Sequence, residues 1–174
     1  KSTRGGRLVI ENFFLLTLIL STLLCALVTG LILGFAIVVM PGIAKFSDKE
    51  FLLAFKHMDE VIQRNQPIFM LIWVGSILSV IASIILGKNN LSNYNFYLLC
   101  IASGLYLLGV QAPTIRFNIP LNNELQRLDI SNSDESALAL FRIKFESPWN
   151  RWNVIRSLNG VIAVCMLQLL LLQI

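Results

Sequence analysis

Polar and aromatic side chains share one face of the segment SPWNRWNVIRSLNG (residues 147–160), which leads into a strongly apolar stretch. At about 100° per residue along a helix, an arc of about 120° contains Trp149, Trp152, Asn153, Arg156 and Asn159. An arginine that faces lipid would cost about 2.5 kcal/mol or more at depth, so we predict that this face turns inward. The alternative is an interfacial belt, with tryptophans at the membrane surface and arginines as anchors.

A second polar face lies in GVQAPTIRFNIPLNNELQRL (residues 109–128). Four side chains project within about 80° of one another on a helix: Gln111, Thr114, Asn118 and Asn122. Pro113 and Pro120 lie inside this segment, and each removes an amide donor and frees the carbonyl four residues earlier. Such freed backbone is tolerated near membrane depth only beside protein or a wet cavity. We therefore expect Asn118 and Asn122 to meet Arg156, and a helix exit capped by asparagines is the alternative.

Two residues of types that act as general bases lie on the segment between the first two apolar stretches: His57, the only histidine, and Asp59. Ser47 and Glu50 predict a capping box, and apolar residues at helical spacing predict an amphipathic helix over residues 47–64. Histidine exchanges protons readily near neutral pH, which suits proton abstraction. His57 lies at the edge of the polar face, so the alternative is a solvated surface histidine.

The elements that position these residues belong to a membrane protein. The chain has 174 residues, of which 56% are hydrophobic and only 14% charged, which is far from the balance of a soluble domain. Four apolar stretches are long enough to span a bilayer, at residues 13–40, 67–86, 91–110 and 154–174. We predict an all-α fold: one domain, residues 1–174, built as an integral membrane four-helix bundle.

Local signals predict where the helices begin and end. Pro41 and Gly42 should end the first span, and Ser147 with Pro148 should begin the fourth. A second amphipathic helix, capped by a serine, is expected at residues 133–146. Both amphipathic helices fall on one side of the bundle and should together cover one end of it. Gly30 and Gly34 form a small-xxx-small pair, for which helix packing is the expected purpose.

Several kinds of site are not expected. One histidine and three scattered cysteines (Cys25, Cys100 and Cys165) predict no metal site, and the cysteines are expected to be packing residues. No basic stripe interleaved with aromatics predicts a nucleic-acid partner. With four spans both termini lie on the same side, and the Lys and Arg residues of the two long connections favour placing these connections in the cytoplasm.

Four sequence blocks, in order, resemble the anthrone-oxygenase-like family of small four-helix membrane proteins: VMPGIAKFSDKEFLLAF, VIQRNQPIFM, YLLGVQAPTIRFNIPLNNELQRLD and FESPWNRWNVIRSLNG. The similarity runs from about Val39 to Gly160, and this chain is most similar to the bacterial branch, which implies the bacterial inner membrane. Some fungal members are associated with oxidising an anthrone to an anthraquinone without a metal or flavin. The resemblance therefore implies cofactor-independent oxygenation of a hydroxylated polycyclic aromatic, a hydrophobic small molecule.

The resemblance also suggests roles for the residues. His57, or Asp59 in its place, would remove a proton, and Arg156 with Asn118, Asn122 and Asn153 would stabilise the oxyanion. Trp149 and Trp152 would stack on the ring, with Asn159 on the same face. The alternative is a non-catalytic membrane protein that binds lipid, quinone or haem, or an accessory subunit of a larger complex or homo-oligomer. A buried network of Arg and Asn also serves simply to fix helix register.

Overall fold

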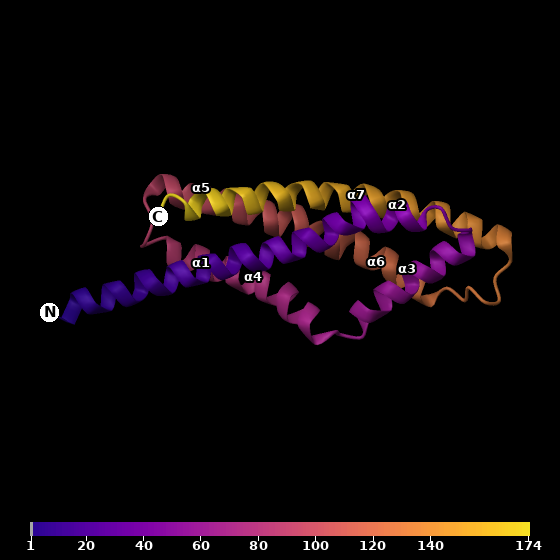
Figure 1. The fold of residues 1–174 in the computed structure, drawn as a ribbon, viewed down its shortest axis with the longest axis horizontal. Helices are drawn as coiled ribbons and strands as arrows, with labels where there is room; N and C mark the ends of the chain where they lie inside the picture. Colours follow the sequence, from indigo (N-terminus) through magenta and orange to yellow (C-terminus); the bar gives the residue numbers. More distant parts are fainter. Residues whose placement is uncertain (1) are drawn as a thin grey trace.

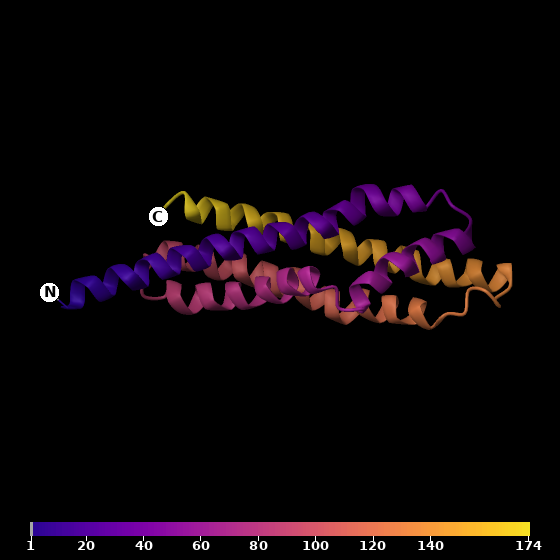
Figure 2. The same cartoon turned by 60° about the horizontal axis from the view of Figure 1, so that its bottom comes forward.

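The computed structural model describes residues 2–174, with side chains from Glu11 onward. Four helical rods lie side by side along one long axis (Figures 1 and 2). Each contains a segment long and apolar enough to cross a membrane: Glu11–Ile43, Pro67–Gly87, Asn93–Arg127 and Glu135–Leu171. No strand occurs in the described part of the chain. The predicted all-α, multi-pass membrane bundle is therefore confirmed.

The first rod runs through the proline that was predicted to end it. It consists of α1 (Ser2–Gly34), a π-helical turn η1 (Phe35–Val39) and α2 (Met40–Ile43), which contains Pro41 and Gly42. A proline lacks an N–H and clashes with the carbonyl four residues earlier. The wider π turn just before Pro41 moves that carbonyl away, so the helix continues to Ile43.

The third rod uses the same device twice. It consists of α5 (Asn93–Tyr106), two π-helical turns, η2 (Leu107–Gln111) and η3 (Thr114–Asn118), and α6 (Ile119–Arg127). Each π turn ends two residues before a proline, at Pro113 and at Pro120. The span predicted to end near residue 110 is therefore helical to Arg127, and an exit at this point was the wrong alternative.

The fourth rod is a single helix, α7 (Glu135–Leu171), in which Pro148 lies in the interior. The predicted helix boundary at Ser147 and Pro148 is wrong. Phe145 and Trp149, on either side of Pro148, are buried in one core, so the helix continues through the proline. The predicted serine cap is also wrong. Asp134 caps this helix, and its side chain accepts a hydrogen bond of 2.7 Å from the amide of Ala137.

The second rod is bent. It consists of α3 (Asp48–Gln63) and α4 (Pro67–Gly87), joined at a corner formed by Arg64–Gln66. The predicted capping box of Ser47 and Glu50 is present. The amphipathic helix expected at residues 47–64 is α3, which runs back along the bundle against α6 and α7, and the corner bows outward (Figure 1).

Two apolar cores lie at different levels. One joins all four rods near the chain ends and is centred on Leu18, Leu99, Tyr106 and Leu167. The other joins α2, α3, α6 and the first half of α7 around Phe51, Phe55 and Phe145. At 1.5 Å per residue the 21 residues of α4 extend about 31 Å, which matches the hydrocarbon thickness. The length of α4 therefore suits a single crossing, and the second core lies on the far side of the corner from the chain ends.

Candidate functional site

The local sequence Gln63–Arg64–Asn65–Gln66–Pro67 explains the corner. Asn65 has a φ of 56°, a left-handed conformation that asparagine tolerates better than most residues and that commonly ends helices. The side chain of Gln66 accepts a hydrogen bond from the amide of Phe69, and Pro67 occupies the first turn of α4. Because α3 stops here and α4 restarts in a new direction, the two helices diverge from the rods beneath them.

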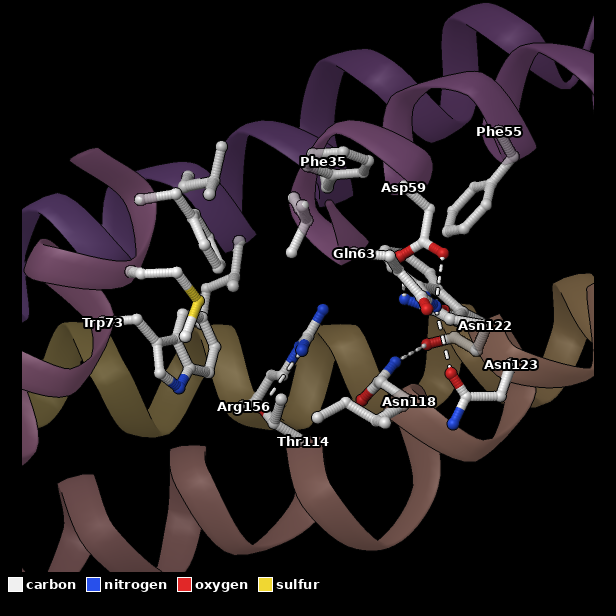
Figure 3. A pocket seen from close by; sticks show the side chains of 17 residues that line it. Phe35, Phe55, Asp59, Gln63, Trp73, Thr114, Asn118, Asn122, Asn123 and Arg156 are labelled. Atoms are coloured by element: carbon white, nitrogen blue, oxygen red, sulfur yellow. Dashed lines mark hydrogen bonds between the residues drawn. The ribbon is translucent and has the colours of Figure 1, made fainter. Parts of the chain in front are cut away.

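A cavity of about 310 Å³ lies beneath this corner (Figure 3). This volume is at the lower end of the range of about 300–1,000 Å³ that small-molecule sites have. Residues of all four rods line the cavity, and they include five aromatic and seven polar side chains: Leu31, Ile32, Phe35, Phe55, Asp59, Ile62, Gln63, Phe69, Met70, Trp73, Thr114, Asn118, Ile119, Asn122, Asn123, Trp149 and Arg156.

Arg156 points into this cavity from α7 (Figure 3). Its side chain is buried, at 6% exposure. The Nε and Nη2 atoms donate to Oδ1 of Asn153 over 3.0 and 2.8 Å, and Nη1 donates to Oγ1 of Thr114 over 3.0 Å. The amide of Asn153 donates to the carbonyl of Ile32 over 3.0 Å, which fixes its oxygen toward the guanidinium. All of these acceptors are neutral.

Asp59 lies on the α3 side of the same cavity and is also buried. Its Oδ1 accepts from the amide of Asn122 over 2.7 Å, and its Oδ2 accepts from Gln63 over 2.9 Å and from Gln126 over 2.8 Å. The carboxylate is thus held by three amide donors. Each carboxylate oxygen has two lone pairs, so Oδ1 keeps one free.

Asn122 connects the carboxylate of Asp59 to the aromatic lining of the cavity. Its amide oxygen accepts from Nε1 of Trp149 over 2.8 Å while its amide nitrogen donates to Asp59. Trp149 packs against Phe35 and Phe55, with ring centroids 5.8 and 5.1 Å away. Asp59, Asn122 and Trp149 therefore form one hydrogen-bonded relay with fixed side chains.

The structure brings five of the nine predicted site residues to the cavity: Asp59, Asn118, Asn122, Trp149 and Arg156. Asn118 donates to the carbonyl of Trp149 over 3.3 Å, and its own buried Oδ1 has no hydrogen-bond partner within the described residues. Asn153 does not line the cavity but orients Arg156. The inward orientation predicted for Arg156 is therefore found, and the purely interfacial alternative is wrong for this residue.

Three predicted residues lie elsewhere. The side chain of His57 is 73% exposed and lies 3.8 Å from Glu60, on the outer surface of α3. Trp152 stacks on Phe117, with centroids 3.7 Å apart and planes 5° from parallel, outside the cavity. Asn159 donates to the carbonyl of Ile155 and packs against Gly109 below it. None of the three touches the cavity.

The apolar lining residues other than Trp149 were not identified from the sequence. The polar lining residues Gln63, Thr114 and Asn123 were also not identified as site residues. Gln63 follows Asp59 by one helical turn, so its spacing already predicted that the two side chains meet. Thr114 was noted in the polar face of its segment but not as a partner of Arg156. Phe69, Met70 and Trp73 carry no such signal, because apolar residues in a membrane span give no indication of which ones face a cavity.

Among the described residues no three His, Cys, Asp or Glu side chains gather in a metal-binding group. The fold and the site define a multi-pass membrane bundle with a buried cavity that has an arginine in one wall and a carboxylate in another. The family model for anthrone oxygenase matches residues 55–166, more than half of the chain, so the chain belongs to the anthrone oxygenase family. No curated protein and no solved structure matches the chain significantly.

Proposed function

We propose that this protein oxygenates a hydroxylated polycyclic aromatic of the anthrone type, with O₂ as the only co-substrate and no cofactor. The observation that carries the proposal is that a buried carboxylate, Asp59, and a guanidinium with only neutral partners, Arg156, line the same aromatic-walled cavity. Proton abstraction from a ring methylene whose carbanion is conjugated with a carbonyl needs these two groups, a base and a cationic hydrogen-bond donor.

The first step is removal of a proton from the ring methylene. The free lone pair of Asp59 Oδ1 accepts this proton, and the electron pair delocalises onto the ring carbonyl, which becomes an oxyanion. Arg156 donates to that oxyanion. Hydrogen bonds to Asn153 and Thr114 hold the guanidinium of Arg156 in place before the reaction. No reorganisation of this group is therefore required when the charge develops.

The second step transfers electrons from the carbanion to O₂. A carbon–oxygen bond forms, and Asp59 returns its proton to the resulting peroxide. Loss of the second methylene proton and cleavage of the O–O bond then give a ketone and release hydroxide, which is protonated to water. One anthrone and one O₂ yield one anthraquinone and one water, so carbon is oxidised, O₂ is reduced and no other reductant is needed.

The walls of the cavity suit a flat ring. Phe35 and Phe55 lie on one side, Trp73 lies on another, and Trp149 is fixed by its bond to Asn122 (Figure 3). Aromatic side chains contact ring faces and edges favourably and exclude water. Exclusion of water strengthens the interaction of Arg156 with a developing oxyanion.

The test is O₂ uptake by the protein in lipid nanodiscs supplied with a model anthrone, together with the absorbance of the anthraquinone product. Asp59→Asn keeps the shape but removes the base, and we expect a loss of about 10²–10⁴-fold in the rate above the spontaneous reaction. Glu60→Gln on the same helix is the matched control, and His57→Ala should also retain the rate. Equal rates for wild type and Asp59→Asn would refute the proposal.

A non-catalytic function is the second candidate. It is favoured by the three amide donors around Asp59, because a carboxylate tied so closely to neighbouring side chains also serves to fix helix register. In that case the cavity holds a lipid or quinone. Purified protein that shows no O₂ uptake above the spontaneous rate, but carries a stoichiometric quinone or lipid, would establish this function instead.

A further inference from the structure

We infer that the cavity binds its aromatic ligand as an anion, so that the ligand must carry an acidic phenol oxygen whose negative charge pairs with Arg156. This inference rests on the cavity of the proposed function and deepens it. It concerns binding and not turnover, and it makes Arg156 the residue that selects for an acidic ligand.

The first argument is the missing counter-charge. Among the described residues no carboxylate lies within ion-pair distance of Arg156, although its side chain is only 6% exposed. Buried charges in proteins are almost always paired, because an unpaired charge out of water is costly. By contrast Arg142, the other arginine with a largely covered side chain on α7, contacts both Asp48 and Glu146.

The second argument is the number of unused donors. Arginine has five N–H groups. Three of them are occupied in Arg156, one each from Nε, Nη1 and Nη2, and all go to neutral oxygens of Asn153 and Thr114. The remaining N–H groups of Nη1 and Nη2 belong to the guanidinium that reaches into the cavity (Figure 3). Two unused N–H groups on a cation are suited to a charged oxygen.

Asp59 does not take this place. It lies on α3 across the cavity, and its charge is already solvated by the amides of Asn122, Gln63 and Gln126. A ligand between the two groups therefore has its ionised oxygen at Arg156 and its apolar or hydrogen-bearing edge toward Asp59. The cavity orients a ligand by charge at one end only.

The third argument concerns the body of the ligand. Two apolar lining residues are also exposed on the outer surface: Leu31 and Ile119. Leu31 belongs to the apolar span Glu11–Ile43 and Ile119 to the apolar span Asn93–Arg127, so the cavity reaches the outer surface of two spans. A ligand that enters here comes from the bilayer, so it is lipophilic, and the aromatic walls favour a flat ring over a flexible chain.

The test uses a hydroxyanthraquinone whose phenol ionises near neutral pH with a red shift of its absorbance. Because this probe is already a quinone, it cannot be oxygenated, and binding is measured apart from turnover. In nanodiscs at neutral pH we expect the wild type to bind it with the red-shifted phenolate band. Arg156→Gln should bind it about 10- to 100-fold more weakly, the range that a hydrogen bond to a charged group contributes, and the band should be lost.

Matched controls make the result specific. Arg151→Gln removes the same charge from an exposed position on the same helix and should bind like wild type. Unsubstituted anthraquinone should bind equally to wild type and Arg156→Gln, which shows that the cavity of the variant is intact. Arg156→Lys keeps the charge and should retain the phenolate band with reduced affinity.

The inference is overturned if Arg156→Gln binds the hydroxylated probe as tightly as wild type, or if the bound probe stays un-ionised in wild type. A long-chain fatty acid tests whether the site is specific for an aromatic phenolate, because a fatty acid also carries an ionised oxygen on an apolar body. Oleate at equal concentration should not displace the probe, and displacement would overturn the aromatic specificity. These results do not depend on O₂ uptake, so failure of the proposed function is recognised separately.

Discussion

The two halves of the bundle use the same helices but pack in opposite ways. Toward the chain ends buried hydroxyl groups join neighbouring rods directly, such as Ser21 with Ser83 at 2.8 Å and Tyr106 with Ser76 at 2.7 Å. Toward the corner they are long amides, a carboxylate and a guanidinium, and three prolines each follow a π-helical turn. The first half is closed and the second encloses a cavity.

The difference shows how a membrane bundle obtains internal space. Glycines let the rods approach in the closed half: an added Cβ at Gly160 would lie 2.7 Å from Oγ1 of Thr29, and one at Gly87 would lie 2.7 Å from Leu99. In the open half, the corner and the widened turns move backbones apart, and polar side chains bridge the space. Space is made by the backbone, and side chains only line it.

The largest expected effect tests the closed half. Gly160→Leu places a large side chain against Thr29, and overpacking of this kind should lower the free energy of unfolding by about 3 kcal/mol. Gly30→Leu is the matched control and should leave stability unchanged, because a Cβ there meets nothing within 4 Å. Equilibrium unfolding in mixed micelles measures both. Similar losses in the two variants would show that the halves do not differ in this way.

A smaller effect tests the origin of the open half. Pro113→Ala removes the reason for the preceding π turn, so the helix should tighten and rotate Thr114 away from Arg156. We expect binding of the hydroxyanthraquinone probe to weaken about tenfold, equivalent to about 1.4 kcal/mol, with stability retained or increased. Pro148→Ala is the control, since no π turn precedes Pro148, and it should bind normally. Unchanged binding of the probe by Pro113→Ala would show that the cavity does not depend on the π turn.

The smallest effect concerns the corner. Asn65→Ala places a residue with a Cβ and no polar group in the left-handed region and should lower the free energy of unfolding by about 1 kcal/mol. Asn65→Gly should be neutral or slightly stabilising, because glycine adopts this conformation freely. Both are measured by the same unfolding assay. A loss of stability in Asn65→Gly that matches Asn65→Ala would assign the effect to the amide and not to the backbone.

The membrane class, the four spans and the inward face of Arg156 follow from the sequence because hydrophobicity and helical periodicity determine them. The prediction for residues 149–159 was too broad. An arc of about 120° is wide enough to include residues that face neighbouring rods, and Trp152 and Asn159 are two such residues. Asn118 and Asn122, predicted with Arg156, do line the cavity with it.

The continuity of the helices was not predictable from single residues. Pro41, Pro113, Pro120 and Pro148 all lie inside helical rods, because the preceding turn widens or the flanking side chains pack tightly. Neither condition is visible in the sequence alone. Gly30 and Gly34 were expected to serve helix packing, yet no group of the described chain lies against either. His57 was singled out by residue type, but the face of α3 that turns inward belongs to Phe51, Phe55 and Asp59.

The bend in the second rod has a consequence for how the protein responds to its surroundings. The other three apolar segments have 33, 35 and 37 residues and are longer than the hydrocarbon layer is thick, whereas the length of α4 matches this thickness. We therefore expect thinner or thicker lipid to act chiefly on the tilt of α4, with the chain bending at the corner that contains Asn65. On this expectation, acyl-chain length in the host bilayer becomes a physical variable that changes how widely the chamber opens.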